Sequence, residues 1–458
     1  MARTRNTLLE SVINELGWSQ ERVAAHFRRT AAEHAASELL TVTRSHINQW
    51  VRGSRPSAPA PDILCETLSR GLGRVVTLAQ IGLAPSTPVP PTTWDWDADT
   101  VVQLVDIGGD SMRDLTRRKL LGYSAAGAGL PSEPWWRERA QQAQERRSLS
   151  RRTISPAHVE AVREAMHHYS RQDQRLGGDA GRAALLAYLQ HDVADYLSRR
   201  VSCEGLRREL YSAAAELVYL AGWMSFDASD HGQAQQCFTL AFRIAAEADD
   251  APLAGHILRA AAHQAIDLGH PQRALDIAEG SLTQGRYALA SPREKALLGV
   301  VHARALAAAQ HKQAALAALR RAEDDLGRAR EDLEPSRVFF FGEASLAHET
   351  ACTLRDLGDL KGAEAEFQRS VRTRGKPFLR THAVTLGYLG DVQVRQGHLD
   401  AACQTWGQAL DVIDGIQSGR VRDTVVHMRR ALSPVRGRGG SAASEVDRRA
   451  AAVLRGVG

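Results

Sequence analysis

Apolar side chains recur along most of this chain at intervals of three and four residues, the spacing that places them on one face of an α-helix. The first run comprises Leu8, Leu9, Val12, Ile13 and Leu16, and Gly17 ends it. A second helix is expected from Gln20 onward, with Ser19 as its N-cap and Val23, Ala24 and Phe27 facing inward. From about Ser155 the chain is a succession of amphipathic helices. The pattern predicts an all-α protein.

The segment TRSHINQWVRG predicts a short third helix with one apolar stripe, formed by Ile47, Trp50 and Val51. Thr43 can cap this helix and Gly53 ends it. Its opposite face carries hydrogen-bonding side chains that can read base edges in a DNA major groove. These candidates are Arg44, Ser45, His46, Asn48, Gln49 and Arg52, and a backbone N–H at Gln20 can meet a phosphate. The alternative is a solvated helix face without a partner.

SQERVAAHF followed by TRSHINQWVRGSRP resembles the lambda-repressor-like (XRE-type) helix-turn-helix, over about Leu8–Leu83. The family pattern S-x-x-I-x-x-W-x-x-G is matched by Ile47, Trp50 and Gly53, with Ser45 offset by one position. The resemblance implies double-stranded DNA as a partner. It places Arg44, Ser45 and Gln49 toward bases, with Asn48 and His46 beside them, and Arg52 and Arg55 nearer phosphates.

One departure from that family concerns the connection between the second and third helices. The compact family joins them by a turn of a few residues, whereas Arg28–Val42 intervene here. Either the second helix is longer or a loop is inserted. The angle at which the third helix would enter a groove therefore differs from the family pattern.

A proline-rich segment, APSTPVPPTT at 84–93, excludes helix and central strand and predicts a tether. We expect Trp94 and Trp96 to dock it on a neighbour. Farther on, RRKLLGYSAAGAGLP (117–131) has the look of a twin-arginine export signal. An export signal lies at the start of a chain, and a helix-turn-helix precedes this segment, so a packing helix is favoured over export.

The sequence predicts four parts: a head at 1–83, a linker and packing helix at 84–154, repeats at 155–434 and a tail at 435–458.

One phrase recurs in the C-terminal two-thirds: a small turn, an alanine, a residue four positions on, and a small residue three further. Its leading alanines, spaced 40, 40, 49 and 39 apart, are Ala234, Ala274, Ala314, Ala363 and Ala402. The phrase resembles the second helix of the tetratricopeptide repeat, whose usual period is about 34. That implies a helical-repeat superhelix whose concave groove takes a peptide or protein. A generic helical bundle is the alternative.

In that family the first helices line the groove, and Tyr211, Trp223, His263 and Gln264 lie in expected first helices, although a core or plain surface position is the favoured reading for each. The run FFFGE at 339–343 is expected in the core. The Gly- and Arg-rich end, from Val435, predicts a flexible basic tail that touches DNA or is simply solvated.

Charge and chemistry narrow the functional classes further. A net charge of +5 over 458 residues permits a nucleic-acid partner without demanding one. The five cysteines are far apart, no apolar run approaches a membrane span, and the N-terminus is polar, so we expect a cytoplasmic protein without membrane contact. His191, Asp192 and Asp195 are expected to form a solvated face. No catalytic, cofactor-binding or metal-binding motif is found, and the prediction is that the protein is not an enzyme.

A DNA-reading head, a tether and a repeat body resemble the transcriptional regulators of actinobacteria that combine these parts, some of which control development or secondary metabolism. The first hypothesis is a cytoplasmic regulator that binds an operator as a homodimer and senses a peptide or protein. The second is an interaction scaffold of tetratricopeptide type that does not read DNA sequence.

Overall fold

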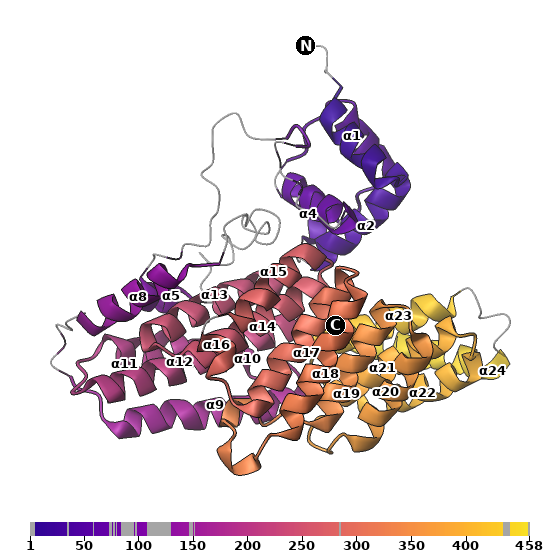
Figure 1. The fold of residues 1–458 in the computed structure, drawn as a ribbon. Coiled ribbons are helices and arrows are strands. Elements are labelled where there is room, and N and C mark those ends of the chain that lie inside the picture. Colours follow the sequence, from indigo (N-terminus) through magenta and orange to yellow (C-terminus); the bar gives the residue numbers. More distant parts are fainter. Residues whose placement is uncertain are drawn as a thin grey trace.

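The computed structural model describes residues 5–33, 36–57, 59–72, 76, 78, 80–83, 96, 99–107, 130–145, 150, 152–283, 285–433 and 440–456. Throughout these residues the named elements are helices, and an isolated β-bridge joins Thr153 and Arg200. A small head stands on a long curved body in Figure 1. The prediction of an all-α protein is confirmed for the described residues. None of their helices is both long enough and apolar enough to cross a membrane.

The head comprises α1 (Thr7–Leu16), α2 (Gln20–Glu33), a 3-10 turn η1 (Ser37–Leu39), α3 (Arg44–Val51) and α4 (Ala60–Leu72). These elements enclose a core of their own, and the expected inward positions on α1, α2 and α3 belong to it. The exception is Leu8, which is 52% exposed. The head core lies at Leu9, Val12, Ile13, Val23, Ala24, Phe27, Ile47, Trp50, Val51, Ile63, Leu64 and Leu68.

Two helices before the body pack against its first pair. α5 (Thr100–Asp106) and α8 (Glu133–Glu145) contact α13, and the Trp136 indole N–H donates to Asp249 at 3.0 Å. Trp96 lies edge-on to Trp135 and Phe242, with ring centroids 6.0 and 5.5 Å away. Trp96 therefore docks as expected. Trp94, the segment 84–93 and residues 117–129 of the twin-arginine-like stretch lie outside the described residues.

The body begins with α9 (Pro156–Leu176), α10 (Arg182–Tyr188), a π-helical turn η2 (Leu189–Val193) and α11 (Ala194–Ser198). Six successive helix pairs follow, and each pair stacks on the next (Figure 1). The short elements α16 (Gly285–Ala288), η3 (Glu331–Leu333) and η4 (Ser336–Val338) lie between pairs. The pairs are α12 (Glu204–Asp227) with α13 (His231–Ala248), α14 (Ala251–Asp267) with α15 (Pro271–Leu282), α17 (Pro292–Ala308) with α18 (Lys312–Gly327), α19 (Glu343–Asp356) with α20 (Leu360–Thr373), α21 (Leu379–Arg395) with α22 (Leu399–Val412), and α23 (Gly419–Leu432) with α24 (Gly440–Gly456).

The recurring sequence phrase lies on the second helix of five pairs, where its small and bulky positions are buried against the first helix. In α18 the expected leading alanine is wrong by one residue, whereas the expected second position, Ala318, is buried. Ala314 is exposed, whereas Ala315 is buried. The buried triplets are Ala234, Phe238 and Ala241; Ala274, Ala278 and Ser281; Ala315, Leu319 and Ala322; Ala363, Phe367 and Ser370; and Ala402, Trp406 and Ala409.

Two further expectations are corrected. The segment expected as a flexible tail forms α24, whose Ala443, Val446 and Ala450 are buried against α22 and α23. Small apolar side chains at helical spacing give this basic segment a face that can pack. In the run of three phenylalanines Phe341 is buried, but Phe339 is 40% exposed, so the run lies in the core in part.

Candidate nucleic-acid interface

The third helix of the head, α3, presents the polar face that the sequence predicts. Ile47, Trp50 and Val51 are buried in the head core, which fixes the rotation of this short helix. On the opposite side every candidate except one is exposed to solvent, and Asn48 is half-buried. The exposed candidates are Arg44, Ser45, His46, Gln49, Arg52 and Arg55.

His46 takes part in the helix cap. Its Nδ1 accepts the backbone N–H of Thr43 at 3.1 Å and lies 3.0 Å from the Thr43 hydroxyl. A histidine at the third helical position thus closes a capping box, which orients the first turn of α3. The predicted base-reading role for His46 is consequently limited to the ring atoms that the cap leaves exposed.

Arg55 has a structural contact that the sequence did not indicate. Its Nη2 donates to the Leu83 carbonyl at 2.8 Å, which ties the segment after α3 to the end of the head. Asn6 makes a similar tie, because its backbone N–H donates to Val51 and its side chain to Ile81, both at 2.8 Å. These bonds hold both ends of the head against α3.

The long connection between α2 and α3 combines the two alternatives left open by the sequence. α2 extends to Glu33, and the 3-10 turn η1 follows before α3 begins. Arg28 on α2 donates to the Val42 carbonyl at 2.7 Å, so the end of the connection is fastened to the helix before it. Gln20 is the first residue of α2 and is half-buried, so its backbone lies at a helix N-terminus as expected.

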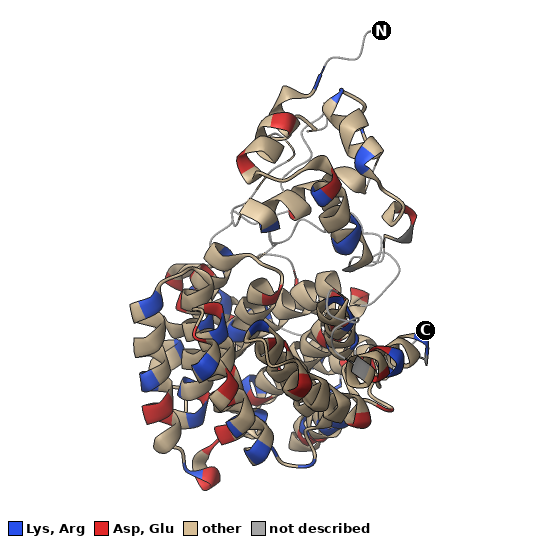
Figure 2. Cartoon of the chain, turned by 90° about the vertical axis from the view of Figure 1, so that its right-hand side faces the viewer, with Lys and Arg blue, Asp and Glu red and all other residues tan. Residues whose placement is uncertain are grey.

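The head touches the body through α4. Glu66 lies in the middle of α4, and its carboxylate is 2.8 Å from both Arg70 Nε and His270 Nε2. His270 is the N-cap of α15, and the Glu66 and His270 side chains are 3% and 4% exposed. Figure 1 shows the head resting above α15, and Figure 2 shows charges of both signs on its helices. Sequence analysis did not identify this contact, because its members lie 204 residues apart.

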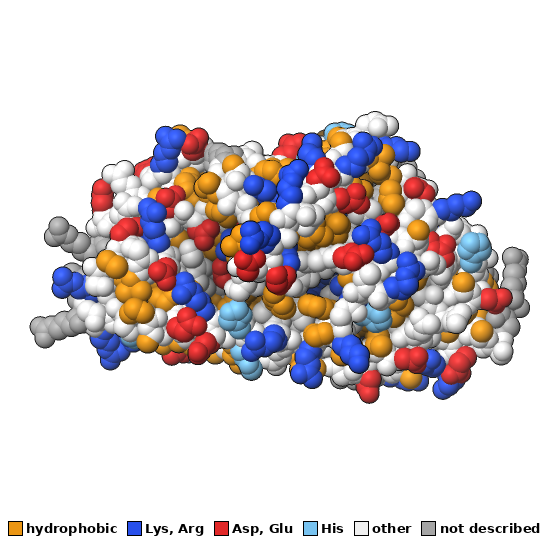
Figure 3. Space-filling view, turned by 60° about the horizontal axis from the view of Figure 1, so that its bottom comes forward, with side chains coloured by type: hydrophobic (Ala, Val, Ile, Leu, Met, Phe, Trp, Pro, Cys, Tyr) orange, Lys and Arg blue, Asp and Glu red, His pale blue; other side chains and the backbone are white. Residues whose placement is uncertain are grey.

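Inside the body, one cavity of about 80 Å³ opens where the first helices of several pairs converge with α9. Trp223 and His263, which the sequence placed on first helices, line it, whereas Tyr211 and Gln264 are buried in the core. Figure 3 views the body from below and shows apolar side chains between charged ones of both signs around a hollow. The body therefore contains a cavity lined by both polar and apolar side chains.

Comparison with known families gives a match confined to the head. Residues 9–84 match the family model described as the SP15 N-terminal domain, a range that spans α1 to α4. No curated protein matches the chain.

Proposed function

We propose that this protein is a DNA-binding transcriptional regulator with a lambda-repressor-like helix-turn-helix head and a tetratricopeptide-like repeat body. The exposed polar front of α3, fixed on a buried stripe, supports this proposal most strongly. Arginine and glutamine side chains on such a front can bond guanine and adenine edges in a major groove. Arg52 and Arg55 would lie nearer the phosphate backbone.

The regulator would act in the cytoplasm as a homodimer. One short helix reads few base pairs, so two copies on adjacent half-sites are needed for operator specificity. Light scattering of the protein–DNA complex tests this part. A complex containing one chain on a specific site would refute the dimer.

The body would sense a peptide or protein and change how the head is held. The contact from Glu66 to His270 supports this coupling, because it joins the head to the turn between the second pair's helices. A ligand that binds more tightly when the contact is open favours the open state. The difference between its affinities for the two states sets how far the equilibrium of the head shifts. If a ligand bound to the body of the wild-type chain does not change its affinity for DNA, the coupling is refuted.

The experiment that tests DNA binding is fluorescence anisotropy of a labelled duplex over a range of salt concentrations. A DNA reader loses affinity steeply with salt, because bound arginines release counterions from the phosphates. We expect Arg44→Ala with Gln49→Ala to weaken binding. Arg171→Ala, an exposed arginine on α9, is the control and should leave binding unchanged.

The second candidate function is a protein-interaction scaffold without sequence-specific DNA binding. The stacked helix pairs of the body favour it, since such arrays commonly hold protein partners. Equal, weak binding of every duplex by wild type and by the Arg44→Ala, Gln49→Ala variant would support the scaffold and refute the regulator.

A further inference from the structure

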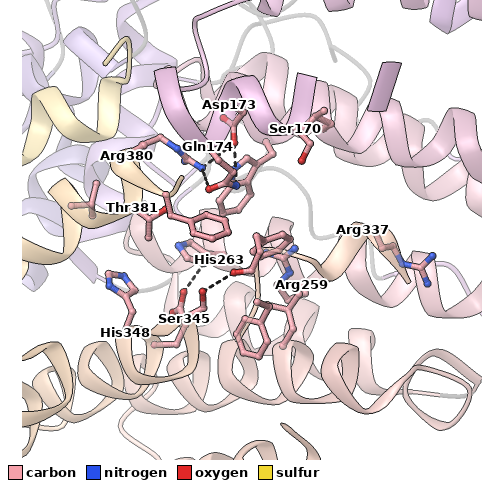
Figure 4. Close-up of a pocket in the computed structure, with 18 of the residues that line it drawn as sticks. Ser170, Asp173, Gln174, Arg259, His263, Arg337, Ser345, His348, Arg380 and Thr381 are labelled. Carbon is pink, nitrogen blue, oxygen red and sulfur yellow. Dashed lines mark hydrogen bonds and ion pairs between the residues drawn. The ribbon is translucent and has the colours of Figure 1, made fainter. Parts of the chain in front are cut away.

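The cavity in the body is walled by helices from distant parts of the chain. Figure 4 shows labelled side chains from α9, α14, α19 and α21 around it, and residues of α12 also line it. Its volume of about 80 Å³ exceeds the roughly 10–15 Å³ that one internal water needs on the same measure. The cavity therefore has room for a group of several atoms.

Most of the arginines in this wall are paired with carboxylates. Arg337 bonds Glu294 and Glu216, at 2.7 and 3.0 Å. Arg380 bonds Asp227 and Asp173, at 2.6 and 2.9 Å. A buried charge is stable when it has an opposite charge beside it.

Arg259 on α14 is one of two exceptions in this wall. It is 2% exposed, and within the described parts of the chain it has no ion pair. Its Nη2 lies 2.8 Å from the Tyr219 hydroxyl and 3.0 Å from His256 Nε2, and its Nε has no acceptor among these residues. The guanidinium is a permanent cation held in the wall of the cavity.

Neither of its two acceptors supplies a negative charge. Burial raises the pKa of the Tyr219 phenol, although Arg259 itself acts in the opposite direction. Burial and then the Arg259 cation lower the pKa of His256 to about 4. Both groups are neutral near pH 7, so the charge of Arg259 is left uncompensated by its hydrogen bonds.

A second arginine of the same wall is in a similar position. Arg374 at the end of α20 donates to the Ala344 carbonyl at 2.9 Å and the Ser370 hydroxyl at 2.8 Å, and its Nε has no acceptor in the described structure. Burial lowers the pKa of Arg374 to about 10, with Glu349 acting against the shift and Arg380 adding to it. No carboxylate among the described residues forms an ion pair with it.

Aromatic rings surround the unpaired cation. The Arg259 Cζ atom lies 5.5 Å from the Trp223 ring centroid and 5.9 Å from that of Phe340. Both rings line the cavity, together with apolar positions such as Leu220, Leu297 and Val384. An occupant would thus meet unpaired cations and apolar surface, since the two carboxylates that line the cavity, Asp173 and Glu349, are paired with Arg380 and Arg304.

We propose that this cavity binds a carboxylate carried on a short apolar stem, with Arg259 and Arg374 as its cationic partners. The proposal rests on the sensing role proposed above for the body and names the chemistry that the body recognises. A guanidinium binds a carboxylate by charge-assisted, often paired hydrogen bonds. The carboxylate can come from a free branched-chain acid or from the C-terminal end of a peptide.

The test is saturation-transfer NMR and titration calorimetry on the full chain with four probes. These are isovalerate, its neutral analogue isovaleramide, the tripeptide Gly-Gly-Leu and the same tripeptide with a C-terminal amide. We expect an acid to bind and its matched amide to bind at least about tenfold more weakly. Preference for isovalerate identifies a free acid, and preference for Gly-Gly-Leu identifies a peptide end. Absence of binding, or equal binding of acids and amides, overturns the proposal.

Two variants and a control locate the site. Arg259→Met and Arg374→Met should each weaken acid binding at least about tenfold. The control is Arg286→Met, since Arg286 is 3% exposed, lies 5.3 Å from the Phe242 ring centroid and donates to the Gly280 carbonyl, yet does not line the cavity. Circular dichroism melts verify that each variant is folded. Unchanged binding in both cavity variants, or an equal loss in the control, overturns the assignment.

Failure of this site and failure of the proposed function are distinguishable. Acid binding is measured without DNA, and DNA affinity is measured without acid. If the chain binds an acid but reads no DNA sequence, the proposed regulator function is refuted and the proposed carboxylate site stands. If the chain reads DNA sequence but binds none of the four probes, the proposed carboxylate site is refuted and the proposed regulator function stands.

Discussion

Arg380 closes the body by joining helices far apart in the chain. Its guanidinium on α21 bonds Asp227 on α12 at 2.6 Å and Asp173 on α9 at 2.9 Å. All three side chains are 3% exposed or less. The change Arg380→Met removes the cation and leaves two buried carboxylates without it.

The structure sets the size of the effect. Breaking a buried ion pair by removing one partner costs about 3–5 kcal/mol, because the remaining charge is stranded without water. Asp227 keeps one bond, from the Gly178 backbone N–H at 2.8 Å, so part of its charge stays compensated. We therefore expect the free energy of unfolding to decrease by about 3 kcal/mol at neutral pH.

The assay is urea unfolding followed by far-UV circular dichroism, at pH 8 and pH 5. The loss should be smaller at pH 5, because burial raises the pKa of the Asp173 carboxyl group and protonation removes its charge in acid. Adding Asp173→Asn to Arg380→Met should restore part of the stability. Arg448→Met, at an exposed pair with Glu445, is the control and should change little. A loss below about 1 kcal/mol at pH 8 would refute the view that these buried pairs stabilise the fold more than exposed pairs do.

Two further predictions concern packing and pH. An alanine at Gly390 would place its Cβ 2.2 Å from Trp406 Nε1, so Gly390→Ala should lower the free energy of unfolding by about 1–3 kcal/mol. On the partner helix, the Cβ of Gly407→Ala would have its nearest neighbour 3.9 Å away, so this change should raise the free energy of unfolding by up to about 1 kcal/mol. Equal urea midpoints for the two variants would contradict this prediction. Burial lowers the pKa of His348 from 6.5 to about 3. Between these two values the unfolded chain binds a proton at His348 that the folded chain does not bind, so the free energy of unfolding falls as the pH drops from about 6.5 toward 3, by up to about 1.4 kcal/mol per pH unit. His348→Gln should flatten that slope, and an unchanged acid-unfolding curve would contradict the assignment.

Local features of the fold were predictable because their signals lie within one helix. The apolar stripe of α3 and the recurring phrase on the second helices each depend on spacings of three and four residues. The frame of α18 was not predictable, since QAALAAL offers small residues in adjacent registers and only packing against α17 selects Ala315. The extent of α2 was likewise open, because TAAEHAASEL contains no strong helix breaker.

The contacts that shape the two candidate sites depend on residues far apart in the chain. Arg380 and Asp173 are 207 residues apart, and Glu66 and His270 are 204 apart. The sequence contains many arginines in similar local contexts. Which of them lacks a carboxylate partner depends on how the helix pairs stack. Arg259 therefore carried no sequence signal. On α3, the helical spacing of the apolar residues predicted the polar face, but the bond from the Thr43 backbone N–H to His46 depends on a side-chain conformation.

The most direct test of the regulator is a selection from fragmented DNA of the organism's own genome. Full-length wild type is run beside a variant with Arg44, Asn48 and Gln49 changed to alanine, and recovered fragments are sequenced. We predict a recurring motif, arranged as two half-sites, that the variant loses. Equal recovery of fragments without a shared motif by both proteins would contradict the claim that α3 reads DNA.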